Sequence, residues 1–147
     1  MKVYVGSKFS RAAEVREVMD VLESHGHEIV GDWTQHTLAG VAGAELRDRL
    51  TEYAEADFDG VAGADAFVLL HDDASRGGFT ELGIALGLGK LVVVIGGRVR
   101  APHKAPIFYA LEEVEHFEDS YAAAEWLQYL DTVFAAKSHD EMVEASR

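Results

Sequence analysis

The sequence predicts an α/β fold because two kinds of segment alternate along it. Short apolar runs bounded by turn residues are typical of strands, and segments with apolar side chains three and four positions apart are typical of helices. The runs at 65–71 (DAFVLLH) and 90–97 (KLVVVIGG) are almost entirely apolar, which indicates strands buried on both faces of a sheet. We therefore expect a Rossmann-like doubly wound, mainly parallel sheet of about five strands with helices on both faces.

The first third of the chain predicts a strand, a helix, a second strand and a loop. Residues 2–6 (KVYVG) form a short apolar run that ends in glycine, and residues 10–26 repeat apolar side chains at helical spacing before another glycine. Residues 27–33 (HEIVGDW) predict the second strand. Residues 34–43 (TQHTLAGVAG) are rich in turn formers, so we expect a surface loop there, and loops often carry binding sites.

The middle of the chain predicts two helices, one before each of the two apolar strands. The first helical pattern runs from about Ala44 to Ala62, and the second covers residues 79–89 (FTELGIALGLG). Gly83 and Gly87 in the second helix predict that it packs closely on the sheet.

The last part of the chain predicts a short strand near Val114 to Phe117, after a loop that holds both prolines, and a closing helix at 120–136. With 147 residues, 48% of them hydrophobic, the chain is long enough to form one core. We expect a single domain at 1–137. Residues 138–147 (SHDEMVEASR) are polar, and we expect a tail that frays or reaches a neighbouring subunit.

Composition excludes several classes of partner. The formal net charge of −13, from 26 acidic and 13 basic residues, repels nucleic acid, and the basic residues are scattered. The chain has no cysteine and its histidines lack the spacing of a metal motif, so we expect neither a metal nor a cofactor. No apolar run approaches the roughly 20 residues that span a bilayer, and the first residues lack a signal-peptide core. We expect a cytoplasmic protein that binds a small molecule and contacts neither nucleic acid polymers nor membranes.

Three segments follow strands and predict where a ligand binds, because ligands of doubly wound sheets lie outside the carboxyl ends of the strands. They are GSKFSR at 6–11, HDDASRGG at 71–78 and GGRVRAPHK at 96–104. None is a Walker loop, and the first lacks the G-x-G-x-x-G spacing of dinucleotide sites. A nucleoside or nucleotide is therefore a better candidate ligand than a dinucleotide.

Five residues in the first two of these segments suit ligand binding. Gly6 relaxes the backbone after the first strand, and Ser7 adds a hydroxyl donor at a helix start. Gly77 and Gly78 allow the backbone to approach a ligand closely. Asp72 either binds sugar hydroxyls or caps the turn.

Glu81 is a carboxylate in the otherwise small and apolar stretch SRGGFTELGIALGLGK. Spacing alone favours a glutamate in the first turn of a helix, which complements the helix dipole with its head group in solvent. A glutamate held at the ligand end of a closely packed helix can instead attack a sugar carbon that becomes an oxocarbenium ion, as in retaining glycoside hydrolysis. These two interpretations predict different environments for the carboxylate.

Three elements in order resemble the nucleoside 2-deoxyribosyltransferase family. They are Tyr4-Val5-Gly6-Ser7 after the first strand, Asp57 in EADFDGVAGAD, and SRGGFTELG at 75–83. The resemblance extends from the first strand to the strand at 90–96, and its strongest element is the ELG-x-AL-x-x-GK run.

The resemblance implies a mechanism. It implies that Glu81 attacks C1′ of a 2′-deoxyribonucleoside, expels the base and forms a deoxyribosyl ester that another base or water resolves. It implies that Asp57 delivers a proton to the departing base and that Tyr4 orients the glutamate. It also implies a homodimer or higher homo-oligomer in which a neighbouring protomer helps to build the site. Without the resemblance, Asp57 is interpreted as a solvated or capping carboxylate on an acidic helix and Tyr4 as a half-buried strand aromatic.

Ser75 departs from the transferase pattern. Six residues before the glutamate, that family often carries an aspartate that contacts the sugar 5′-hydroxyl. A serine here resembles the related deoxynucleoside 5′-monophosphate N-glycosidases, in which it helps to bind the phosphate. A serine hydroxyl beside glycine amides and Arg76 can donate to a phosphate, which an aspartate would repel. Ser75 is equally an ordinary turn residue.

Aromatic residues offer further candidates. Trp33, after the second strand, either stacks on a base or belongs to the core, and Gln35 beside it could read the base edge. Phe108 and Tyr109 either close over the base or pack the last strand against the sheet. Three aromatics of the last helix predict a core or subunit-interface role: Trp126, Tyr129 and Phe134.

Three functions stay open at this point. The first is transfer of the sugar of a 2′-deoxyribonucleoside from one base to another. The second is hydrolysis of (deoxy)nucleoside 5′-monophosphates to free base and sugar phosphate. The third is a non-catalytic nucleotide-binding sensor, because fold does not determine function. In a sensor, Glu81 could be replaced by glutamine with nucleotide affinity kept, whereas in an enzyme its charge carries the attack.

Overall fold

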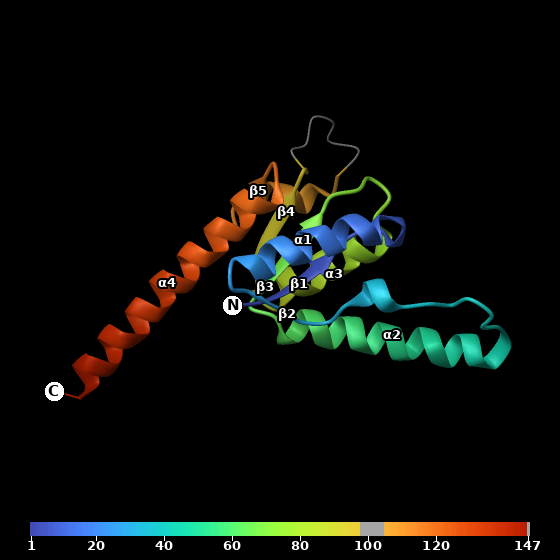
Figure 1. Cartoon of the computed structure of the whole chain (residues 1–147), viewed down its shortest axis with the longest axis horizontal. Helices are drawn as coiled ribbons and strands as arrows, with labels where there is room; N and C mark the ends of the chain where they lie inside the picture. Colours follow the sequence, from blue (N-terminus) through green and yellow to red (C-terminus); the bar gives the residue numbers. More distant parts are fainter. Residues whose placement is uncertain (98–104, 147) are drawn as a thin grey trace.

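The computed structural model describes residues 1–97 and 105–146 and contains a five-stranded sheet in the order β2-β1-β3-β4-β5 (Figure 1). Every pair of neighbouring strands is parallel. The predicted α/β, Rossmann-like fold is therefore confirmed. The strands are β1 (Lys2–Gly6), β2 (Glu28–Ile29), β3 (Ala66–Leu70), β4 (Leu91–Ile95) and β5 (Val114–Phe117).

In the described part of the chain, four α-helices cover the sheet. Helix α1 packs beside α4, and α2 packs beside α3. The chain moves from β1 to β2 in one direction and from β2 through β3 to β4 in the other, so right-handed crossovers place α1 on the face opposite α2 and α3. The helices are α1 (Ala12–Ser24), α2 (Gly43–Gly63), α3 (Arg76–Gly87) and α4 (Ser120–Ala145).

The strand order creates a crevice at the carboxyl ends of β1 and β3. These strands are neighbours in the sheet, and their register pairs Gly6 with Leu69. The connection after β1 leads to one side of the sheet and the connection after β3 leads to the other, which is the point where doubly wound folds bind ligands. All five residues of β3 are buried, so the crevice has a rigid base.

Strand β2 is shorter than predicted. The predicted strand at 27–33 is wrong beyond Ile29, because Gly31 adopts a left-handed backbone with φ of 72° and ends the extended run. The Asp32 side chain then accepts a hydrogen bond from the Thr34 amide and caps the short 3-10 helix η2 (Trp33–Gln35).

Helix α3 begins three residues earlier than predicted, so Gly77 and Gly78 lie in its first turn. The expectation that Gly83 and Gly87 pack against the sheet is wrong. Both are exposed, and a Cβ atom at either would meet no other atom. Larger apolar side chains such as Leu82 face the core instead.

Helix α4 continues past the predicted end at residue 136 and reaches Ala145, extending away from the sheet (Figure 1). Trp126 packs on Phe117, whereas the exposed fractions of Tyr129 and Phe134 are 65% and 46%, so these two do not belong to the core. No helix in the described part of the chain has the length and apolar character needed to cross a bilayer. The candidate segment at 96–104 lies outside the described residues from position 98 on.

Candidate active site

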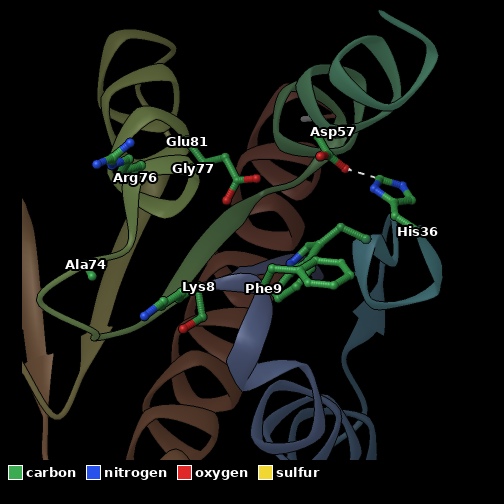
Figure 2. A pocket seen from close by; sticks show the side chains of 10 residues that line it. Lys8, Phe9, His36, Asp57, Ala74, Arg76, Gly77 and Glu81 are labelled. Carbon is green, nitrogen blue, oxygen red and sulfur yellow. Dashed lines mark ion pairs between the residues drawn. The ribbon is translucent and has the colours of Figure 1, made fainter. Parts of the chain in front are cut away.

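A pocket of about 510 Å³ lies at the carboxyl ends of β1 and β3. Segments after both strands form it, together with η2, the loop that follows and α2. Figure 2 shows Glu81 between Lys8 and Arg76 on one side and Asp57 and His36 on the other. The lining residues are Ser7, Lys8, Phe9, Trp33, His36, Asp57, Ala74, Arg76, Gly77 and Glu81.

Glu81 lies in the second turn of α3 and points into this pocket (Figure 2). Its Oε1 accepts a hydrogen bond of 3.1 Å from the Tyr4 hydroxyl, and its Oε2 is buried without a hydrogen-bond partner among the described residues. Burial raises the pKa of Glu81 to about 8, although the Tyr4 hydrogen bond acts in the opposite direction. The interpretation of Glu81 as a solvated first-turn carboxylate is therefore wrong.

Gly6 provides the space that the Glu81 carboxylate occupies. A Cβ atom at position 6 would lie 2.5 Å from Oε2 of Glu81 and 2.9 Å from the Phe67 ring. Any other residue here would displace one of these groups. Gly6 thus acts in the site by its small size and does not itself line the pocket.

Tyr4 is fully buried, and its ring stacks on Phe67 with 6.1 Å between centroids. Burial and the charges of Glu81 and Asp57 raise the pKa of its hydroxyl, so Tyr4 stays protonated and serves as a hydrogen-bond donor. The resemblance implied that Tyr4 orients the glutamate; in the structure the Tyr4 hydroxyl donates to Oε1 of Glu81, and the role stays a prediction.

We predict that Gly60→Ala lowers both stability and activity, because a Cβ atom at position 60 would lie 2.7 Å from the Tyr4 ring. Overpacking of this kind costs about 1–3 kcal/mol of unfolding free energy and would shift the tyrosine. Gly63→Ala on the same helix is the matched control, since its Cβ atom would meet nothing. We expect it to be neutral or to stabilise by up to about 1 kcal/mol. Equal unfolding midpoints of the two variants in urea would contradict this account.

Asp57 reaches the pocket from α2, at the side opposite Lys8 and Arg76 (Figure 2). Its Oδ1 lies 3.8 Å from Nε2 of His36, which stacks on Tyr53. Burial raises the pKa of Asp57, and His36 and the Tyr4 hydroxyl oppose that rise. A half-buried carboxyl with a raised pKa is suited to donate a proton to a ligand.

The glycine and serine residues predicted as ligand contacts differ in whether they line the pocket. Ser7 lines the pocket, but its hydroxyl donates to the Leu70 carbonyl at 2.8 Å and joins the ends of β1 and β3. Gly77 lines the pocket. A Cβ atom at Gly78 would lie 2.8 Å from Cδ1 of Leu69 and would also overlap Oγ of Ser75, so the start of α3 packs on β3 too closely for a side chain at position 78.

Two further predicted contacts, Ser75 and Asp72, do not line the pocket of the free protein. Ser75 is fully buried, and its hydroxyl forms no hydrogen bond with the described residues. Asp72 accepts a hydrogen bond from the Ala74 amide at 2.9 Å and so stabilises the turn. Their roles in substrate binding stay predictions.

The aromatic candidates divide between core and pocket. Trp33 is buried, its indole N–H donates to the Val5 carbonyl at 2.7 Å, and part of its ring lines the pocket. Tyr109 is buried against His116, and its hydroxyl hydrogen-bonds Nδ1 of His71 at 2.8 Å. Tyr109 therefore packs the last strand, as one of its two interpretations proposed, while Phe108 beside it is exposed.

Three pocket residues were not predicted: Phe9, His36 and Ala74. The rule that ligands lie after the strands covers Phe9 and Ala74, and His36 lies in the surface loop predicted at 34–43. Among the residues that the structure describes, no three His, Asp or Glu side chains are placed to hold a metal ion.

Two solved structures with a similar fold are enzymes of nucleoside and nucleotide chemistry. A 2-deoxyribosyltransferase from Bacillus psychrosaccharolyticus matches at a TM-score of 0.64 and 20% identity, over 84% of this chain and 90% of that one. A CMP N-glycosidase of Clostridium botulinum matches at a TM-score of 0.56 and 15% identity, over 86% of this chain and 98% of that one. The chain has the 2-deoxyribosyltransferase fold. No family model and no curated protein sequence matches it.

The 2-deoxyribosyltransferase fold agrees with the resemblance carried by the sequence motifs. The site adds independent detail, because Asp57 of α2 and Glu81 of α3 line one pocket, and the buried Tyr4 of β1 donates a hydrogen bond to Glu81. Their positions in the sequence are far apart, so only the fold brings them together.

Proposed function

We propose that this protein cleaves the N-glycosidic bond of 2′-deoxyribonucleosides and transfers the sugar to another base. The observation that carries the proposal is the Glu81 carboxylate, which is buried at the pocket, held through one oxygen by Tyr4 and unpartnered at the other. A carboxylate used only for structure would have both oxygens hydrogen-bonded or solvated. The likeness to a 2-deoxyribosyltransferase and to a CMP N-glycosidase supports the same chemistry.

The pocket suggests one orientation of the substrate. Lys8 and Arg76 lie at one side of Glu81, and Asp57, His36 and Phe9 lie at the other (Figure 2). The sugar then lies over Glu81 with its 5′ end toward the cations. The base lies toward Asp57, where a ring nitrogen can receive a proton.

The reaction proceeds in two steps. In the first, the bond from C1′ to the base nitrogen breaks, the Glu81 carboxylate forms an ester bond to C1′, and the Asp57 carboxyl gives its proton to the base. In the second, a new base or water attacks C1′, gives a proton to Asp57, and the Glu81 carboxylate leaves. The protein thus returns to its starting protonation state.

Burial makes the two carboxyls hold one proton between them near neutral pH. The active form has the proton on Asp57 and the charge on Glu81, whereas burial favours the proton on Glu81. The Tyr4 hydroxyl donates a hydrogen bond of 3.1 Å to Glu81 and so stabilises the charged form of this carboxylate. This donation gives Tyr4 its function in the proposed mechanism.

We predict a bell-shaped pH profile of kcat/KM with its alkaline limb near pH 8. Activity needs one proton on the pair, and that proton leaves as the pH passes the raised pKa of Glu81, about 8. Activity then falls about tenfold per pH unit. The measurement is kcat/KM for base release from pH 4 to pH 10, in steps of about half a pH unit. A rate that keeps rising above pH 8 would mean that no proton donor takes part.

Hydrolysis of 5′-monophosphates is a second candidate, favoured by one observation. Two cations, Lys8 and Arg76, line the pocket, and its described lining holds no carboxylate besides Asp57 and Glu81. A sugar 5′-phosphate needs cationic or N–H donors, which these residues and the start of α3 supply. A sugar 5′-hydroxyl needs neither a cationic side chain nor an N–H donor.

Chromatography of reaction products tests both candidates. The purified protein is incubated with each deoxynucleoside and each 5′-monophosphate, with and without a second free base. A new nucleoside that forms only with the second base supports transfer, and free base released mainly from monophosphates supports hydrolysis. No product in any reaction would favour the nucleotide sensor.

A further inference from the structure

A second cavity of about 370 Å³ adjoins the pocket. Phe9, His36 and Asp57 line both cavities, so the two cavities are neighbours that meet at these side chains. We call the second cavity the annex. Its other lining residues come from the loop after η2 and from α2: Leu38, Leu50, Tyr53 and Ala54.

Large apolar side chains of the annex are exposed to solvent. The exposed fractions are 62% for Phe9, 41% for Leu38 and 48% for Leu50. Single exposed apolar residues are ordinary, but several around one cavity mark a binding surface. A ligand that covers them removes apolar area from water.

Polar atoms of the annex wall are already engaged. The Tyr53 hydroxyl donates to the Thr37 carbonyl at 3.0 Å and accepts from the Thr37 amide at 3.2 Å. The His36 ring stacks on Tyr53 with 3.9 Å between centroids, and its Nε2 faces Asp57. The annex therefore presents aliphatic and flat aromatic surface, with its acidic group only at the junction with the pocket.

We propose that the annex binds an apolar substituent on the departing base. This inference rests on the proposed function, in which Asp57 protonates the base at the junction. The main pocket alone, at about 510 Å³, is within the range of roughly 300 to 1,000 Å³ that holds a small ligand, so the annex adds room beyond an ordinary nucleotide. The substrate class is a 2′-deoxynucleoside, or its 5′-monophosphate, whose base carries an alkyl or aryl group.

Calorimetric titration with free bases tests the inference without any turnover. The probes are adenine against N6-butyladenine and cytosine against N4-butylcytosine. Each buried methylene contributes about fourfold in affinity, so we expect the butylated base to bind at least about tenfold more tightly in one or both pairs. Equal or weaker binding of the butylated base in both pairs would overturn the inference. If the butylated base binds tightly but the protein releases base from no nucleotide, the proposed function is contradicted and the inference about the annex is still supported.

Two serine variants on α2 locate the effect. Leu50 and Phe58 are each 48% exposed, but only Leu50 lines the annex. We expect Leu50→Ser to remove most of the preference for the butylated base and Phe58→Ser to keep it. A preference that survives Leu50→Ser, or is lost equally in both variants, places the substituent elsewhere. The parent protein could instead show no preference for the butylated base while Leu50→Ser, but not Phe58→Ser, has a lower oligomer mass in light scattering. That result would mean that a second copy of the chain covers the annex, and it would overturn the inference.

Discussion

Replacing Glu81 with glutamine abolishes base release, with an expected loss of about 10⁴-fold or more in kcat, because a neutral amide cannot form the ester to C1′. The side chain keeps its size, so the fold and the contact with Tyr4 survive. The measurement is the initial rate of base release at saturating substrate. Glu52→Gln, an exposed carboxylate change on α2, is the control and should leave the rate unchanged. Activity of Glu81→Gln within tenfold of the parent protein would end the proposed mechanism.

The same variant should be more stable than the parent protein at high pH. Burial raises the folded-state pKa of Glu81 from 4.5 to about 8, so the folded protein holds a proton that the unfolded chain releases. Stability of the parent protein therefore falls as pH rises from 4.5 to 8, and glutamine has no charge to bury. A gain in thermal midpoint at pH 9 that is absent at pH 4 separates this effect from a change in packing.

Asp57→Asn has the second largest expected effect, a loss of about 10²- to 10⁴-fold in kcat, because the base must then leave without a proton. Asp59→Asn on the same helix, where the carboxylate is exposed, is the matched control. The loss should shrink for a substrate whose base is more acidic, since such a base leaves readily as an anion. The alkaline fall in the pH profile should also disappear in Asp57→Asn. An equal loss for acidic and ordinary bases would show that Asp57 acts by another route.

The sequence predicted correctly those pocket residues that follow directly from where a strand ends. The strands at β1 and β3 are apolar runs bounded by turn residues, and the ligand rule for doubly wound sheets then placed Ser7, Gly77 and Glu81 near one crevice. The pairing of Asp57 with Glu81 came from the family resemblance and not from periodicity. Both carboxyls line the same pocket in the structure.

The remaining differences come from tertiary contacts that periodicity does not encode. The predicted helix begins at residue 79, after Gly77 and Gly78, whereas in the structure both glycines lie in the first turn of α3 and Gly78 packs on Ser75 and Leu69. His36 ends the short helix η2, where its ring stacks on Tyr53 and its Nε2 lies 3.8 Å from Oδ1 of Asp57.

The most direct test of the account is a search for the sugar bound to Glu81. The protein is mixed with a deoxynucleoside or its 5′-monophosphate, quenched in acid within the first turnover, and examined by intact-mass and peptide mass spectrometry. The account predicts a mass gain of one deoxyribosyl group, or one deoxyribosyl phosphate, on the peptide that contains Glu81, and no gain in Glu81→Gln. Rapid base release with no adduct, or an adduct on another residue, would contradict it.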